Sequence, residues 1–223
     1  MFRKQAQLLS TGPRELGTSR RRAFIELFTT SKIGLGLLGT GRGRRDASAQ
    51  SQFREACIKA YNSQNPDPRR LTLWCPIIKG WVPQIDSTAA HLFAYKHGQE
   101  VMDTIFGMME KPDLFSPLNG MIVSDLVESI FDEGFMAIVP RLPDNPTLGQ
   151  IALWNNSEPK EYKIRIIDPT NRNAQNFIGH SNTKWEDLDG TNVEFRSSFR
   201  PRARYLYFHY CIQVLRRAWR ASD

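Results

Sequence analysis

The chain has 223 residues, of which 40% are hydrophobic and 24% charged, and its net charge is +7. This composition is typical of a globular protein and excludes collagen-like and wholly disordered chains. The longest apolar run in the first fifty residues, "IGLGLLG", is far shorter than the roughly 20 residues that cross a membrane, so we expect no transmembrane segment and no membrane partner.

The positive charge is concentrated near the N-terminus. Residues 1–50 hold ten Lys and Arg against three acids, whereas the rest of the chain holds twenty of each sign. We therefore predict a basic, disordered tail over residues 1–50 and one folded domain over residues 51–223. The tail has the composition of a mitochondrial transit peptide, but its "SRRR" is equally compatible with a nuclear address, an arm for nucleic acid or a tail with no specific role.

Two features exclude other kinds of site. Cys57, Cys75 and Cys211 are odd in number and widely spaced, which fits a reducing intracellular compartment and offers neither a disulfide framework nor a Cys-x-x-Cys zinc site. "GLGLLG" at residues 34–39 fits G-x-G-x-x-G, but no strand pattern precedes it and no helix pattern follows. Dinucleotide binding is therefore not expected.

The first predicted elements lead to a histidine. Residues 39–50 have no hydrophobic period and are predicted to be a linker, and Phe53, Cys57 and Tyr61 recur at helical spacing after it. "LTLWCPIIKGWVP" alternates like a strand and turns near Gly80. It leads into "STAAH", so we expect a strand to end at His91.

The next elements follow a turn, helix and strand order. Asn119-Gly120 predicts a turn, residues 124–132 a helix and residues 135–139 a strand. "EYKIRIID" and "NVEFR" are expected to be further strands. In "RPRARYLYFHYCIQVLRRAWR", large apolar residues share one helical face, which predicts an amphipathic C-terminal helix: Tyr205, Phe208, Ile212, Leu215 and Trp219.

These pieces resemble a known family. "AAHLFAYKHGQEVMDTIFG", "LFSPLNGMIVSDLVESIFDEGFMAIVP" and "EYKIRIID", in this order and spacing, are similar to the HNH endonuclease domain of many uncharacterised fungal proteins. The likeness extends over about residues 53–220. It implies an α+β fold: a ββα-metal hairpin-helix core with additional strands and a C-terminal amphipathic helix.

The resemblance also implies roles for two residues. His91 matches the general base of the family, and an imidazole with an ordinary pKa of about 6.5 is largely neutral at pH 7. Asn119 matches the residue whose carboxamide fixes the loop and so orients that base. Without the resemblance, His91 would be interpreted as a core histidine and Asn119-Gly120 as an ordinary turn.

The metal ligands depart from the family pattern. Glu128 stands where the family has a ligating histidine, and Ala90 stands where many members have a second ligand. A carboxylate suits Mg²⁺ or Mn²⁺, so the resemblance implies one weakly held divalent metal ion, with Asp125 and His97 as substitute ligands. Asp132 is interpreted as a local capping or pairing residue. Without the family, these acids would be a solvated helix face.

Contacts to nucleic acid are expected to be nonspecific and made to phosphate by cationic residues: Lys96, Arg200, Arg202 and Arg204. Three functions therefore remain open. The first is a divalent-metal-dependent HNH endonuclease that hydrolyses phosphodiester bonds in DNA. The second is a degenerate HNH fold that binds nucleic acid or a protein partner without cleavage; a structural domain addressed by its basic tail is a third, weaker interpretation.

Overall fold

The computed structural model describes residues 47–179 and 181–220. Residues 1–46 of the predicted tail, and with them the targeting signals expected there, lie outside the described residues. Only residues 47–50 of the tail are described. The chain divides into two compact units, one containing residues 94–114 and the other residues 47–93 and 115–220. No helix in the described ranges has the length and apolar character needed to cross a membrane.

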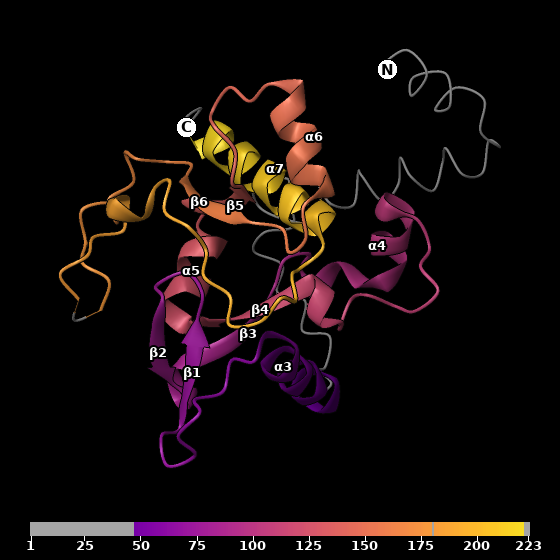
Figure 1. Cartoon of the computed structure of the whole chain (residues 1–223), viewed down its shortest axis with the longest axis vertical. Coiled ribbons are helices and arrows are strands. Elements are labelled where there is room, and N and C mark those ends of the chain that lie inside the picture. The colour runs from indigo at the N-terminus through magenta and orange to yellow at the C-terminus, as the bar shows by residue number, and fades with distance from the viewer. Residues whose placement is uncertain (1–46, 180, 221–223) are drawn as a thin grey trace. The chain divides into compact units, whose positions relative to one another are not determined.

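The larger unit mixes helices and short strands (Figure 1). It contains α3 (Ala47–Tyr61), β1 (Thr72–Cys75), β2 (Gly80–Pro83), β3 (Ser87–His91), β4 (Gly120–Ser124), α5 (Asp125–Asp132), β5 (Met136–Pro140), α6 (Leu148–Asn156), β6 (Tyr162–Ile166) and α7 (Ala203–Arg220). The strands form three antiparallel pairs, β1 with β2, β3 with β4 and β5 with β6. The α+β class and the hairpin-helix core are thereby confirmed.

α3 begins at Ala47, inside the segment that was expected to be a linker. Its buried residues Phe53, Cys57 and Tyr61 are the apolar positions that the sequence pattern predicted, and they pack against the β3–β4 pair. Every residue of β4 is buried, because β3 pairs with it and both α3 and α5 pack against it. The core of the unit therefore surrounds the strand that follows Asn119.

The expected strand at "NVEFR" is wrong. Asn192 forms only an isolated bridge to Lys163. The backbone N–H of Val193 donates to the Tyr162 carbonyl, but that of Glu194 donates to the carbonyl of Pro76. The segment thus changes partner after two residues, too early to extend the β5–β6 pair.

α7 lies along β5 (Figure 1). Tyr205 and Leu206 in its first turn are buried, and the Phe208 ring packs against Phe93 with centroids 5.2 Å apart. The predicted amphipathic helix is thereby confirmed, and it reaches the backbone segment just after β3. α6 was not expected from the sequence, because none of its residues is buried and its apolar residues follow no clear stripe.

The smaller unit is built on η2 (Tyr95–His97), a short 3-10 helix, and α4 (Gly98–Phe106). The Gln99 side chain donates to Asp103 at 2.7 Å and accepts a hydrogen bond from the Leu114 backbone N–H at 2.9 Å. Met102 is buried within the helix face. This unit contains His97 and Lys96 of the predicted site.

Candidate active site

His91 stands at the end of β3. The antiparallel register pairs Ser87 with Ser124 at one end and His91 with Gly120 at the other, so the last residue of β3 faces the first residue of β4. Twenty-eight residues, 92–119, separate these partners along the chain. Asn119, at the end of that insertion, is therefore brought back next to the strand that bears His91.

Asn119 fixes the backbone that follows His91. Its side chain is fully buried, its Oδ1 accepts a hydrogen bond from the Phe93 N–H at 2.8 Å, and its Nδ2 donates to the Phe93 carbonyl at 3.0 Å. The Leu92 N–H donates to the Asn119 carbonyl at 2.9 Å. Because a carboxamide can both accept and donate in this way, Asn119 holds the two residues after His91 in one conformation.

Two aromatic rings enclose the imidazole of His91. Phe53 of α3 stacks on it with centroids 4.1 Å apart and an interplanar angle of 22°. Phe115 meets it edge-on at 5.4 Å and 86°. This apolar burial lowers the pKa of His91 to about 4, because the charged imidazolium loses its hydration. His91 is therefore a neutral imidazole at pH 7 and a weaker base than an exposed histidine.

Gly120 is required by the approach of Phe53. A Cβ at Gly120 would lie 2.2 Å from Phe53 Cζ and 2.9 Å from the Ala90 carbonyl oxygen. Tyr61, two turns further along α3, donates its hydroxyl to the Gly120 carbonyl at 2.7 Å. α3 is thus fitted to the first residue of β4 by two aromatic side chains.

α5 presents carboxylates beside this hairpin. The Ser124 side chain caps the helix by accepting from the Val127 N–H at 3.3 Å, and Val127, Ile130 and Phe131 bury the opposite face. Asp125 is exposed and Glu128 half-buried, three residues apart and hence on nearly the same face. The side chain of Asp132 lies outside the described residues.

The expected metal ligands do not form a closed cage. Within the described part of the chain, no three His, Cys, Asp or Glu side chains gather as a metal site. Ala90 is 4% exposed and paired with Met121, so its position offers no ligand. The donors on α5 are oxygens, which fit a hard cation that keeps most of its water. They fit a weakly held ion and not a tightly held one.

Residues 75–139 match the family model described as HNH endonuclease. This match runs from the end of β1 to β5 and includes His91, Asn119 and the whole of α5. Residues 75–139 are thus similar to an HNH endonuclease domain. No curated protein and no solved structure matches the chain. HNH domains generally use a divalent metal and act on nucleic acid, and the likeness expected from the sequence is confirmed for this segment.

The three predicted arginines lie outside the matched segment and line a cavity of about 720 Å³. Arg200, Arg202 and Arg204 line it, together with Lys160 and Glu158 from the loop before β6. Arg200 is mostly engaged in structure: it donates to the carbonyls of Lys160, Ser197 and Phe199. The fourth predicted cation, Lys96, belongs to the smaller unit.

Sequence reasoning missed the residues that surround the predicted base and the cation opposite the arginines. Phe53 and Tyr61 were assigned only to a helix face, and no pattern in the sequence marked Phe115 or Lys160. Phe53 lies 38 residues from His91, which its ring contacts, and Lys160 lies 40 residues from Arg200, which donates to its carbonyl. No local period carries such information.

Proposed function

We propose that the HNH domain hydrolyses phosphodiester bonds in DNA with the help of a divalent metal ion, Mg²⁺ or Mn²⁺. The observation that carries this proposal is the clamp of Asn119 on both polar groups of Phe93. A buried carboxamide that fixes the backbone two residues after a strand-end histidine would help to hold that histidine in position as a base. Asn119 is then a positioning residue and His91 the catalytic base.

The chemistry assigned to His91 is proton transfer. A water molecule attacks the phosphorus, its proton passes to the neutral imidazole, and the ester bond from phosphorus to the leaving oxygen breaks. The low pKa keeps His91 deprotonated in the resting state at pH 7. The stacked Phe53 ring and the Asn119 clamp restrict the directions in which the imidazole can point.

Glu128 would hold the metal ion, with Asp125 as the second carboxylate. A bound divalent cation would neutralise negative charge on the scissile phosphate and on the leaving oxygen. Because Mg²⁺ binds through one or two carboxylates and retains several waters, two carboxylates on one face of α5 are a sufficient but weak protein contribution.

Incubation of supercoiled plasmid with the protein and Mg²⁺ or Mn²⁺ tests the proposal. Nicking should require the metal and should be abolished in His91→Ala. His209→Ala, which removes an imidazole from α7, is the matched control and should retain nicking. Circular dichroism of both variants shows that they are folded. Equal nicking by the wild type and His91→Ala would remove the assignment of His91.

A second function is supported by a specific observation. The described residues contain no group of three His, Cys, Asp or Glu at a common point, so a domain that binds nucleic acid without cleavage is the alternative. It predicts salt-sensitive DNA binding by the wild type and no nicking at any Mg²⁺ or Mn²⁺ concentration.

A further inference from the structure

The cavity of about 720 Å³ is lined by none of the residues assigned to hydrolysis, His91, Asn119 and Glu128. Its wall comes from three segments of the larger unit: Leu118 before the Asn119 clamp, Glu158 and Lys160 before β6, and residues 198–204 at the start of α7. The Arg202 N–H donates to the Leu118 carbonyl at 2.9 Å. The cavity is therefore built onto the same turn that carries Asn119.

The wall is cationic on one part and apolar on another. Lys160, Arg200, Arg202 and Arg204 contribute positive charge against the single carboxylate of Glu158. Glu158 is 77% exposed and already paired with Lys160 at 3.0 Å, so it reduces the positive charge only in part. Arginine and lysine in this number on one concave surface favour an anion, and phosphate above others.

The cavity is too large for a phosphate group alone. Pockets of roughly 300–1,000 Å³ bind ligands of drug or cofactor size, and a single phosphate would leave most of this volume empty. Leu118, Phe199, Pro201 and Ala203 supply the apolar lining beside the cations. An aromatic ring next to a cationic groove is the arrangement with which proteins bind unpaired nucleotides, with the base against the ring and the phosphate on the cations.

Phe199 is held in place for such a contact. Its ring meets Tyr61 edge-on at 5.1 Å, and the guanidinium of Arg200 donates to its carbonyl at 2.9 Å. Arg200 also donates to the Lys160 carbonyl at 2.8 Å, and so joins the two cationic segments into one rigid wall. A stiff wall gives up little conformational entropy when a ligand binds.

We propose that this cavity binds one unpaired nucleotide of a nucleic-acid strand, with Arg202 and Arg204 on its phosphate and Phe199 against its base. The inference rests on the proposed function and adds a preference to it, for single-stranded or locally opened DNA over intact duplex. The same chemistry is shared by a free mononucleotide, which the experiment separates from a strand.

The test uses the full chain and fluorescence anisotropy with a labelled short oligothymidine, a blunt duplex of the same length and unlabelled thymidine monophosphate as competitor. The wild type should bind the single strand at least about tenfold more tightly than the duplex. Arg202→Ala/Arg204→Ala should weaken single-strand binding by about tenfold or more and should lower the salt slope by roughly 0.7 for each phosphate that is no longer neutralised.

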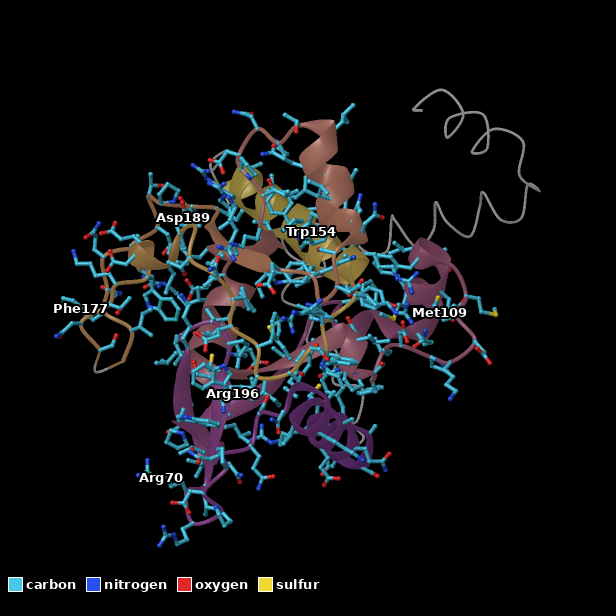
Figure 2. All side chains as sticks on the ribbon, in the orientation of Figure 1. Arg70, Met109, Trp154, Phe177, Asp189 and Arg196 are labelled. Carbon is cyan, nitrogen blue, oxygen red and sulfur yellow. The ribbon has the colours of Figure 1, made fainter. Side chains whose placement is uncertain are left out.

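Arg69→Ala/Arg70→Ala is the matched control, since it removes the same charge from exposed side chains on the loop before β1, where Arg70 is labelled (Figure 2). It should leave the affinity within about threefold. Phe199→Leu keeps apolar volume against Tyr61 and should weaken single-strand binding several-fold without a change in salt slope. Equally weakened binding by the two double variants would overturn the proposal.

The remaining outcomes separate the inference from the nuclease proposal. If duplex and single strand bind with equal affinity, the cavity does not select an unpaired nucleotide. If thymidine monophosphate binds as tightly as the oligothymidine, the ligand is a free mononucleotide and not part of a strand. If the wild type nicks plasmid and Arg202→Ala/Arg204→Ala binds the single strand unchanged, the nuclease proposal stands and the nucleotide-binding proposal is rejected. If that variant binds more weakly and the wild type does not nick plasmid, the nucleotide-binding proposal stands and the nuclease proposal is rejected.

Discussion

Phe53 stacks on His91 with their ring centroids 4.1 Å apart, and this contact joins α3 to the end of β3. The two residues lie 38 positions apart along the chain. Phe115 covers the imidazole edge from another direction and is itself 38% exposed. The histidine is therefore enclosed by one deeply buried ring and one ring that solvent reaches.

This enclosure predicts an unusually acidic histidine. The imidazole of His91 should titrate with a pKa of about 4 because burial disfavours its charged form. Phe115→Ala removes the exposed cover and should raise that pKa toward the ordinary value of about 6.5. Proton NMR titration of the histidine ring signals measures both, with His91→Ala to assign the signal. A wild-type His91 with a pKa near the ordinary value of about 6.5 contradicts the enclosure.

The same shift predicts a pH-dependent stability. The folded pKa of His91 lies below the unfolded value of about 6.5, so the unfolded chain takes up the proton first as the pH falls. The contribution of His91 is present in full above about pH 6.5 and is removed progressively between about pH 6.5 and 4; by about pH 5 it should reduce the free energy of unfolding by about 2 kcal/mol.

Urea unfolding at neutral pH and at mildly acidic pH measures this change. His91→Leu cannot titrate, so its stability should fall less than that of the wild type between the two conditions. The difference between the two proteins isolates His91 from the carboxylates that titrate in the same range. Identical pH dependence of both proteins would show that His91 does not contribute.

The Asn119 clamp predicts a large decrease of stability on truncation. Asn119→Ala leaves the buried N–H and carbonyl of Phe93 without their side-chain partners, which should cost about 2–4 kcal/mol. Asn155→Ala, at the exposed end of α6, should change the free energy of unfolding by less than about 0.5 kcal/mol. Chemical unfolding of both variants makes the comparison. Equal effects would mean that the clamp contributes little.

A side chain at Gly120 would clash with two neighbours, Phe53 and Ala90. The Gly120 backbone is extended, with φ at −157°, so alanine is strained only by contact with Phe53 and Ala90. Gly120→Ala should destabilise the domain by about 1–3 kcal/mol. In Phe53→Leu the same substitution should cost less, and a double-mutant cycle measures the difference. Gly149→Ala in α6 has its nearest neighbour at 3.9 Å and should be neutral or stabilising.

Glu128 predicts the metal dependence of cleavage. Glu128→Gln removes the charge and should raise the Mg²⁺ concentration needed for half-maximal nicking by about tenfold or more. Glu128→His should weaken the response to Mg²⁺ and favour softer ions such as Zn²⁺. Glu55→Gln on the exposed face of α3 is the control. A Mg²⁺ titration that is the same for all variants would exclude Glu128 as a ligand.

Local pattern alone determined the elements that lead to the site. The alternation of "LTLWCPIIKGWVP", which leads into "STAAH", predicted a strand ending at His91, and the periodicity of residues 124–132 predicted α5, because strand and helix periods depend on neighbours a few residues apart. Asn119-Gly120 was predicted only as a turn, and the strand β4 (Gly120–Ser124) was not expected. The order of these motifs also indicated the HNH family, which the match over residues 75–139 confirms.

Only the tertiary structure decided what surrounds these residues. The rings of Phe53 and Phe115 against His91, the two hydrogen bonds of Asn119 to Phe93, and the meeting of Lys160 with the arginines before α7 all join segments distant in sequence. The failed strand at "NVEFR" has the same cause, since Pro76 competes for the Glu194 N–H. Burial and charge at such points depend on which surfaces pack together, and no local period encodes that choice.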